Sequence, residues 1–551
     1  MKTIVLGLDG ATFELILPAV ARGELPGFAR LIKEGAWGPL RSTVPADSPS
    51  AWMSFATGVN PGRHGVYGFM ARRPGSYDYE IGSSLLVRAP TLWDRAGGRG
   101  LRVGVINVPF TYPPRPVNGF LVAGMMTPDR ASSFTYPPEL REALLRAVPG
   151  YSIGHGLGRA QGGDPRTILV RGFAATIAAR EQATRLLAAK YEPDLLICVF
   201  TVLDRLQHFL WADRDERHPE HDPSSAQDYR QAIAAAYRQL DGVIVRTLEA
   251  MGKDSLVVVL SDHGFGPVSR TFYVNAWLAE RGYLTLTGAS GEPHPWKNRA
   301  ARLARHILGF LRIGECWRER LRARRLISEA FVRAIDWGRT RAWFGLDRGV
   351  WLNVAGRDPL GTVKTGDEYE GLRSQLIAEL EALEDPETGR RVVAAVHRRE
   401  ELFHGPNLAA APDLLLEPAH DAGDPRGRDV LSERLGFRGP ARFVGPSSPI
   451  SGYHTPEGVL LLWGRGVPAG VRLAGAEMID VAPTILRAIN LPGSEEMDGK
   501  VLLELGGREK GAAETLSEAS AESSAARKNR GIRKDEQLQV EQQLKDLGYL
   551  D

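Results

Sequence analysis

Residues 255–264 read SLVVVLSDHG, an apolar run that ends in an acid and a histidine. A strand that is apolar on both faces belongs in a sheet covered by helices on both sides. Similar apolar runs occur at Thr3–Leu8, Val103–Val108, Asp194–Val202, Asp413–Leu416 and Gly458–Trp463. Helical patterns separate several of them, at Arg166–Lys190, Ala226–Met251, Tyr369–Leu383 and Ile479–Asn490. This alternation predicts an α/β fold, a three-layer α/β/α sandwich around a mostly parallel central sheet.

The composition is that of an ordinary globular protein. The chain has 551 residues, of which 43% are hydrophobic and 25% are charged, so extensive disorder, collagen and coiled coil are not expected. At about 150 residues per domain the length allows three or four units, or one large core with insertions. The 69 Lys and Arg nearly balance the 66 Asp and Glu, which leaves a net charge of +3. This balance does not favour a nucleic acid polymer as partner.

The cysteine count and the apolar segments limit the possible cofactors and location. Two cysteines, Cys198 and Cys316, cannot form a disulfide framework or a cysteine-rich zinc site, so any metal must be held by histidines and carboxylates. The N-terminus, MKTIVLGLDGATF, reaches an acid after an apolar segment shorter than a signal peptide requires. No stretch approaches the ~20 apolar residues of a membrane span. We expect a cytoplasmic protein without a transmembrane segment.

Two segments depart from the strand–helix pattern. Between Lys297 and Arg325, ten Lys or Arg stand against two Glu, with apolar residues interleaved. Between Gly506 and Arg530, Ala, Ser, Glu and Gly dominate, which is typical of a flexible linker. After it, Val540, Leu544 and Leu547 fall at helical spacing. We therefore expect a core formed by residues 1–285 and 342–505, a basic helical cap insertion at 286–341, a linker at 506–535 and a C-terminal amphipathic helix at 536–551.

Acids and histidines lie at the margins of the predicted strands, where a parallel α/β sheet binds its ligands. Taken singly, an Asp at a strand end is usually a helix cap or a turn former, and a lone His is usually a hydrogen-bonded loop residue. Six such groups occur together, and this coincidence predicts a two-metal site that clamps the attacking and leaving oxygens of an in-line displacement. The six are Asp9, Asp204, His208, Asp262, His263 and His454.

A candidate nucleophile lies in the stretch STVPADSPSAWMSFATG at 42–58. Ser50–Ala56 has a helical pattern that stops at Thr57-Gly58, so Ser48 is predicted to be the N-cap and Pro49 the first helical residue. A helix N-terminus stabilises phosphate oxygens and a developing alkoxide. Ser48 alone could serve only as a cap. Beside the metal cluster it is the candidate nucleophile.

Five segments carry a family resemblance. They are LGLDG at 6–10, PADSPSAWMSFATGVNPGRHGV at 45–66, FTVLDRLQH at 200–208, LSDHGF at 260–265 and SGYHTPEGVLLLWGRG at 451–466. Together they resemble the alkaline phosphatase superfamily and, within it, the type I phosphodiesterase/nucleotide pyrophosphatase branch. The stretch at 336–361 and the tail LKDLGYLD at 544–551 also resemble the predicted phosphohydrolase/phosphomutase proteins of this superfamily. We expect the tail to dock onto the core.

The resemblance implies two metal sites and a covalent mechanism. One site would be held by Asp204, His208 and His454, and the other by Asp9, Asp262, His263 and the oxygen of Ser48. Ser48 stands at the position of the family's nucleophile, so a phosphorylated Ser48 would form and then be hydrolysed. Asp and His ligands suit two Zn²⁺ ions, and Mn²⁺ is compatible.

The implied substrate is a phosphorylated small molecule, or a lipid-derived one, with a phosphodiester or pyrophosphate bond. Nucleotide pyrophosphatases carry an Asn that donates to a phosphoryl oxygen where this chain has Phe69. A replacement donor must come from elsewhere, and Asn107, Arg270 and Asn275 are candidates because they lie near predicted strand ends or the SDHG segment. A sulfatase is not expected, because sulfatases need an Arg where this chain has Trp52.

Two other functions stay open. A phosphomonoesterase or phosphomutase would act on monoesters, as in the cofactor-independent phosphoglycerate mutases, which use an arginine-lined cap. A non-catalytic binding protein on this fold would have lost ligands, whereas all seven positions here keep competent side chains. Residues 297–325 allow three roles: a solvated helical pair, a substrate lid whose arginines meet an anion, or peripheral membrane contact through Phe310 and Trp317.

Overall fold

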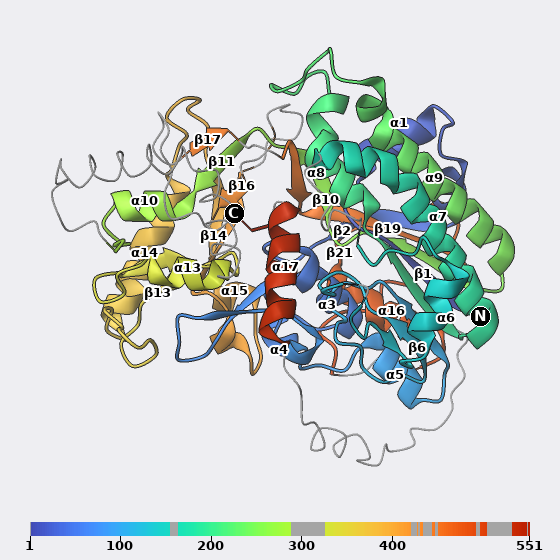
Figure 1. The fold of residues 1–551 in the computed structure, drawn as a ribbon, viewed down its shortest axis with the longest axis horizontal. Coiled ribbons are helices and arrows are strands. Elements are labelled where there is room, and N and C mark those ends of the chain that lie inside the picture. The colour runs from blue at the N-terminus through green and yellow to red at the C-terminus, as the bar shows by residue number, and fades with distance from the viewer. Residues whose placement is uncertain are drawn as a thin grey trace, which may run out of the picture.

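A large sheet forms the core of the part of the molecule that is drawn on the right in Figure 1. The structure is a computed structural model that describes residues 2–129, 131–154, 164–287, 326–419, 427, 430–432, 444–446, 450–491, 496–503, 532–547 and 549–550. Over these residues the sheet has ten strands in the order β20-β2-β19-β9-β1-β8-β5-β6-β7, with β21 beside β2. Their bounds are β1 Thr3–Leu8, β2 Ala36–Arg41, β5 Val103–Ile106, β6 Gly119–Val122, β7 Thr135–Tyr136, β8 Leu195–Phe200, β9 Leu256–Leu260, β19 Glu457–Gly464, β20 Val471–Arg472 and β21 Ala476–Glu477.

The five central strands β9, β1, β8, β5 and β6 run parallel to one another. β19 is antiparallel to both of its neighbours, β9 and β2, and β7 is antiparallel to β6 at the far edge. The central strands β1, β8 and β9 are buried along their whole length, as a sheet covered on both faces requires. The prediction of an α/β sandwich with a mostly parallel sheet is confirmed.

Helices pack on both faces of this sheet. The helices of one layer, joined by mutual contacts, are α1 Phe13–Ala21, α2 Pro26–Glu34, α7 Pro165–Tyr191, α8 Val202–Arg214 and α9 Gln227–Met251. The other layer contains α3 Ser48–Thr57, α5 Leu92–Gly98 and α16 Val481–Ala488, which also contact one another (Figure 1). Two further helices of this part are α4 Pro61–His64 and α6 Leu140–Ala147.

A second, antiparallel sheet lies apart from the first. It has the order β12-β13-β15-β14, with bounds Ala342–Phe344, Val350–Leu352, Leu414–Pro418 and Val393–Arg398. The predicted strand at 413–416 is therefore a strand of this sheet and not of the central one. The nearby helices are α10 Val274–Glu280, α13 Ile327–Arg333, α14 Asp367–Glu381 and α15 Arg399–Leu402. Three smaller sheets pair β3 Met70–Arg72 with β4 Tyr79–Ile81, β10 Gly264–Pro267 with β18 Gly452–Thr455, and β11 Arg270–Tyr273 with both β16 Val430–Ser432 and β17 Val444–Pro446.

The C-terminal helix α17, Lys534–Asp546, lies between these two parts of the molecule (Figure 1). Val540 and Leu544 are buried on one side of it. The Tyr112 hydroxyl donates to Glu536 at 3.0 Å, and Glu541 accepts from the α13 residue Ser328 at 3.0 Å. The helix covers Lys534–Asp546, where a helix at 536–551 was expected, and these contacts attach it to its neighbours.

Several expectations fall wholly or mainly outside the described residues. The basic stretch 297–325 is one, so its three possible roles stay predictions. Most of the expected linker at 506–535 is another. Of the expected cap insertion at 286–341, the described part contains α13 and its flanks. Among the helices of the described ranges, none combines the length and apolar character that crossing a membrane demands.

Candidate active site

Three adjacent strands of the central sheet deliver the predicted acids to one edge. Asp9 follows β1, Asp262 follows β9, and Asp204 lies in the first turn of α8, directly after β8. Because β9, β1 and β8 are parallel neighbours, their carboxyl ends meet. The backbone fixes this meeting, since the Asp204 N–H donates to the Asp9 carbonyl at 3.1 Å.

Two histidines reach the same edge by different routes. His208 lies one turn after Asp204 on α8, so the two side chains share a helix face. His454 lies on β18, where it pairs with Phe265 of β10, the strand that follows His263. The short β10-β18 sheet therefore carries His454 over the end of the central sheet.

Ser48 begins helix α3, and this corrects one prediction. The N-cap is Asp47, whose backbone is extended and whose carbonyl accepts from the Ala51 N–H at 3.1 Å. Ser48 is thus the first helical residue and Pro49 the second, so the prediction of Ser48 as N-cap is wrong by one position. The helix ends at Gly58, which has a φ of 67° as a left-handed C-cap requires.

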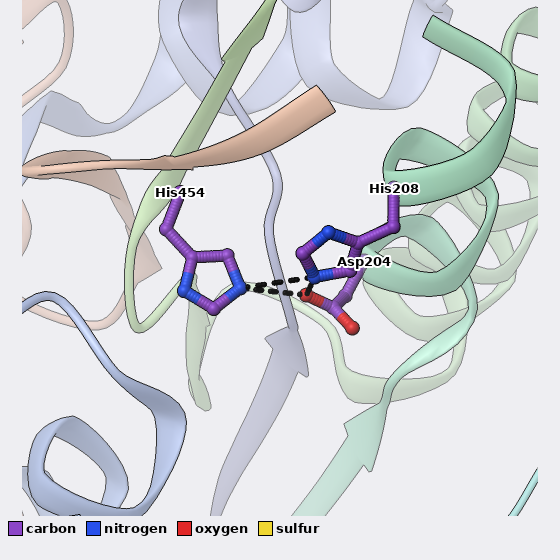
Figure 2. A group of neighbouring side chains, drawn as sticks. All are labelled: Asp204, His208 and His454. Carbon is purple, nitrogen blue, oxygen red and sulfur yellow. Dashed lines mark hydrogen bonds and ion pairs between the residues drawn. The ribbon is translucent and has the colours of Figure 1, made fainter. Parts of the chain in front are cut away.

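Asp204, His208 and His454 form one tight cluster (Figure 2). Asp204 Oδ1 lies 3.3 Å from His208 Nε2 and 3.2 Å from His454 Nε2, and the two Nε2 atoms are 3.2 Å apart. The Nδ1 atom of His208 faces the Gly452 carbonyl at 3.0 Å. The Nδ1 atom of His454 faces the Ala46 carbonyl at 2.8 Å.

Ser48 and His263 form a second cluster with the remaining acids. Ser48 Oγ lies 3.3 Å from His263 Nε2. The same nitrogen is 3.3 Å from Asp262 Oδ2 and 3.7 Å from Asp9 Oδ1. The Nδ1 atom of His263 faces the Gly264 carbonyl at 3.0 Å. The ligand atoms of Asp9, Asp204 and His263 also lie within 4.8 Å of one another, so Asp204 stands between the two clusters.

The three imidazoles present the same nitrogen to the site. A carbonyl oxygen only accepts hydrogen bonds, so each Nδ1 is assigned a hydrogen. A neutral ring, as in His208 and His263, then directs the Nε2 lone pair inward, and His454 would do so after it gives up its second proton. Burial lowers the pKa of His208. Burial and the charge of His454 lower the pKa of His263 well below its ordinary value. Burial opposes a charge on His454 as well, but its hydrogen bonds with Asp204 and Asp47 raise its pKa to about 9.

The carboxylates repel one another in a buried space. All seven predicted site residues are at most 1% exposed. Burial, with the charges of Asp262 and Asp204, raises the pKa of Asp9 well above its ordinary value. Burial and Asp204 raise the pKa of Asp262 to about 7. Burial acts in the same direction on Asp204, but His208 and Arg205 outweigh it and lower the Asp204 pKa well below its ordinary value.

These features fit divalent cations. Asp9 Oδ1 and Asp262 Oδ2 have no hydrogen-bond partner within the described part of the chain. Buried unpaired carboxylate oxygens beside inward-facing imidazole lone pairs call for positive charge. Carboxylate oxygens and imidazole nitrogens are the donors that Zn²⁺ takes in His- and Asp-based sites.

The three weaker substrate-binding candidates have partners in the protein. Asn107 donates to the Ile153 carbonyl at 3.3 Å and accepts from the Tyr151 hydroxyl. Arg270 forms ion pairs with Asp385 and Glu387 at 3.1 and 2.6 Å. The Asn275 amide bonds to both the N–H and the carbonyl of Phe344. Their geometry supplies structural roles, and a role in substrate binding stays a prediction.

Three residues at the site were not among the predicted ones. Arg205 is next to Asp204 in sequence, and its Nη1 lies 3.3 Å from Asp204 Oδ2. Asp47 lies 3.6 Å from His454 Nδ1. Tyr549 donates its hydroxyl to Asp204 Oδ2 at 2.7 Å. The quoted motifs contain Arg205 and Asp47, and their positions beside a predicted ligand and the predicted nucleophile were the signals available. The tail gave no such signal for Tyr549.

One family model and several solved structures match this chain. The model of the type I phosphodiesterase/nucleotide pyrophosphatase family matches residues 3–422. The solved phosphonoacetate hydrolase from Sinorhizobium meliloti 1021, in complex with phosphonoformate, is 15% identical over 88% of this chain and 94% of that chain, with a TM-score of 0.49. Human ectonucleotide pyrophosphatase/phosphodiesterase 5 is 10% identical over 92% of this chain and 99% of that chain, with a TM-score of 0.49. The search of curated proteins gives no match.

Proposed function

From the premise that this chain belongs to the type I phosphodiesterase/nucleotide pyrophosphatase family, we propose that it is a two-metal phosphoester hydrolase acting through Ser48. Its substrate is a phosphodiester or pyrophosphate of a small molecule. The observation that carries the proposal is the contact of Ser48 Oγ with His263 Nε2 at 3.3 Å, beside Asp9 Oδ1 and Asp262 Oδ2, which are buried and have no hydrogen-bond partner within the described residues.

The donor set divides into two groups that would hold the metals. Asp204, His208 and His454 would hold one ion, and Asp9, Asp262, His263 and Ser48 Oγ would hold the other. Zn²⁺ suits both groups, and Mn²⁺ is compatible. When bound, such ions act as Lewis acids that lower the pKa of a hydroxyl and offset charge on phosphoryl and leaving-group oxygens.

The chain's own residues then perform a double displacement. Ser48 Oγ gives up its proton to solvent and attacks phosphorus, so that an Oγ–P bond forms as the bond from phosphorus to the leaving oxygen breaks, and the leaving oxygen takes a proton from solvent. Water then attacks phosphorus, forming a new O–P bond as the Oγ–P bond breaks; one proton of this water returns to Ser48 Oγ, directly or through solvent. The N-terminus of α3, where Ser48 is the first helical residue, stabilises negative charge on the attacking and phosphoryl oxygens.

The experiment compares two chromogenic esters. The purified protein, with its metal content measured, is assayed with bis-p-nitrophenyl phosphate and p-nitrophenyl phosphate in the presence of Zn²⁺ or Mn²⁺. Preference for the diester supports the proposal. Preference for the monoester would replace it by the phosphatase or phosphomutase function. Absence of both metal binding and turnover would overturn the hydrolase proposal.

Two matched variants test the nucleophile. Ser48→Ala removes the attacking oxygen, whereas Ser50→Ala removes an equally buried hydroxyl from the same helix. We expect Ser48→Ala to abolish turnover of whichever ester is cleaved and Ser50→Ala to retain it. Rapid-quench trapping should find phosphorylated protein in the wild type and none in Ser48→Ala.

A further inference from the structure

The end of the chain reaches the candidate metal site. Tyr549 is 1% exposed, and its hydroxyl donates to Asp204 Oδ2 at 2.7 Å, across 345 positions of sequence. Its ring lies edge-on to His208, with the ring centroids 5.4 Å apart. The third residue from the end of the given sequence is therefore as buried as the predicted ligands themselves.

The two oxygens of Asp204 face different surroundings. Oδ1 lies 3.3 Å from His208 Nε2 and 3.2 Å from His454 Nε2, so it points into the metal-ligand cluster. Oδ2 points away from the cluster, to the Tyr549 hydroxyl at 2.7 Å and Arg205 Nη1 at 3.3 Å. Both groups on the Oδ2 side carry hydrogens and neither is a metal ligand of the proposed set.

We propose that Tyr549 is a positioning residue for Asp204, so that the C-terminus completes the metal centre. This inference rests on the proposed function. A carboxylate that accepts a hydrogen bond on one oxygen is restrained to offer the other oxygen to a cation. Such outer partners of metal ligands fix the ligand's orientation, and their removal typically lowers metal affinity by about 10- to 100-fold.

The Tyr549 side chain is held in place from several sides. Its ring packs against Phe69, with centroids 4.5 Å apart, and the guanidinium of Arg205 lies 4.9 Å from its centroid. Its carbonyl accepts from Arg348 at 2.8 Å, and its N–H donates to the Leu544 carbonyl at 2.8 Å. The hydroxyl is thus presented to Asp204 by a ring and a backbone that are already fixed.

Helix α17 anchors the tail to two separate parts of the fold. Glu541 accepts from the Ile327 N–H at 2.7 Å and from the Ser328 hydroxyl at 3.0 Å, which ties the helix to α13. The Tyr112 hydroxyl donates to Glu536 at 3.0 Å, which ties its first turn to the loop after β5. These contacts hold the helix whether or not Tyr549 has a hydroxyl, so the role of that hydroxyl can be tested alone.

The test compares two tyrosine-to-phenylalanine variants of the full-length protein. Tyr549→Phe keeps the ring that packs on Phe69 and removes only the hydroxyl at Asp204. Tyr112→Phe is the matched control, because it removes the hydroxyl that α17 uses for docking away from the site. Each metal-free protein is titrated with Co²⁺, following the visible absorption bands, and with Zn²⁺ in competition with a chromophoric chelator.

For Tyr549→Phe we expect one of two metal sites to bind about 10- to 100-fold more weakly, with altered Co²⁺ bands for that site. The other site and Tyr112→Phe should match the wild type. Unchanged affinity and spectrum in Tyr549→Phe would overturn the inference while leaving the proposed function intact. Tighter binding would overturn it as well, since the hydroxyl would then compete with the metal. A wild type that binds neither ion would overturn the proposed function, and the inference with it.

Discussion

Asp262→Asn removes one negative charge from a buried space that also holds Asp9 and Asp204. Burial and the Asp204 carboxylate raise the pKa of Asp262 to about 7, from an ordinary value of 3.8. The folded protein therefore keeps a proton that the unfolded chain releases, and stability falls as the pH rises across this window. Above pH 7 Asp262 is ionised in the folded protein too, so the loss of stability has reached its full value. The pKa difference of about three units, at about 1.4 kcal/mol per unit, lowers the free energy of unfolding by about 4 kcal/mol.

Whether Asp262→Asn is more or less stable than the wild type depends on whether metal is bound. Asn has the shape of Asp but no charge, so the metal-free variant at pH 8 should be more stable than the wild type by about 2–4 kcal/mol. At pH 4, where Asp262 is protonated in the folded protein, this gain should disappear. With metal present the order should reverse, because the variant has lost a ligand and with it the stabilisation that binding to the native state supplies.

Urea unfolding at both pH values, with and without Zn²⁺, measures these differences. Asp241→Asn is the control: Asp241 is a buried acid that accepts from the Gly27 and Phe28 N–H groups at 3.0 and 2.8 Å, away from the site. Burial raises the pKa of Asp241 as well, but no predicted metal ligand is removed, so the change in stability of this variant should be the same with and without metal. If metal-free Asp262→Asn gains nothing at pH 8, or if Zn²⁺ stabilises it as much as the wild type, the assignment of Asp262 as a metal ligand in a repulsive cluster is wrong.

Three further outcomes are expected. Ser48→Ala should bind nearly the wild-type amount of metal, measured by elemental analysis, because three protein ligands remain for its ion; loss of both ions would make Ser48 structural. Burial lowers the pKa of His64 to about 3, so the unfolded chain alone takes up a proton below its ordinary value of 6.5. Stability should therefore fall by about 2 kcal/mol between pH 7 and pH 5 from this group, and His64→Gln should show a smaller slope in urea unfolding. Arg180 is 1% exposed and donates to three backbone carbonyls at 3.0 and 3.1 Å. Arg180→Met should therefore lower the free energy of unfolding, measured with urea, by about 3 kcal/mol. A loss below about 0.5 kcal/mol would show that those carbonyls find other donors.

The central sheet was predictable because its strands are apolar on both faces. The predicted run at 255–260 corresponds to β9, Leu256–Leu260, and the run at Thr3–Leu8 to β1 with the same bounds. The run at 413–416 has the same appearance but joins the antiparallel sheet as β15. The apolar pattern predicts that a strand is buried, but it does not predict which sheet the strand joins. That choice depends on pairing partners far away in the sequence.

The candidate ligands were predictable for a related reason. Asp9, Asp204 and Asp262 each follow a strand, and parallel strands bring their carboxyl ends together whatever their order in the chain. The predicted start of helix α3 differs from the observed start by one residue, because Asp47 and Ser48 are both good N-cap residues. The structure selects Asp47, whose backbone is extended while that of Ser48 is already helical.

The outer side of the site was beyond such reasoning. Arg205 and Tyr549 contact Asp204 Oδ2 and also each other, and no local pattern links a helix residue to the last turn of the chain. Their contact requires α17 to be docked between the two sheets, which in turn requires α13 and the loop after β5 to be in place. Local spacing predicts which side chains one element presents, whereas the partners of those side chains depend on the assembled fold.

This dependence has an energetic consequence for the proposed metal centre. Its proposed ligands come from the segments after β1 and β9, from helices α3 and α8 and from β18, and none of these segments can assemble the cluster alone. The unfolded chain has no such site, so the free energy of metal binding adds to the stability of the folded state. The repulsion among Asp9, Asp204 and Asp262 acts in the opposite direction when no cation is bound. The proposed cluster therefore lowers the stability of the metal-free protein and raises that of the metal-bound protein. Metal binding and the folding of this sheet edge are thermodynamically coupled.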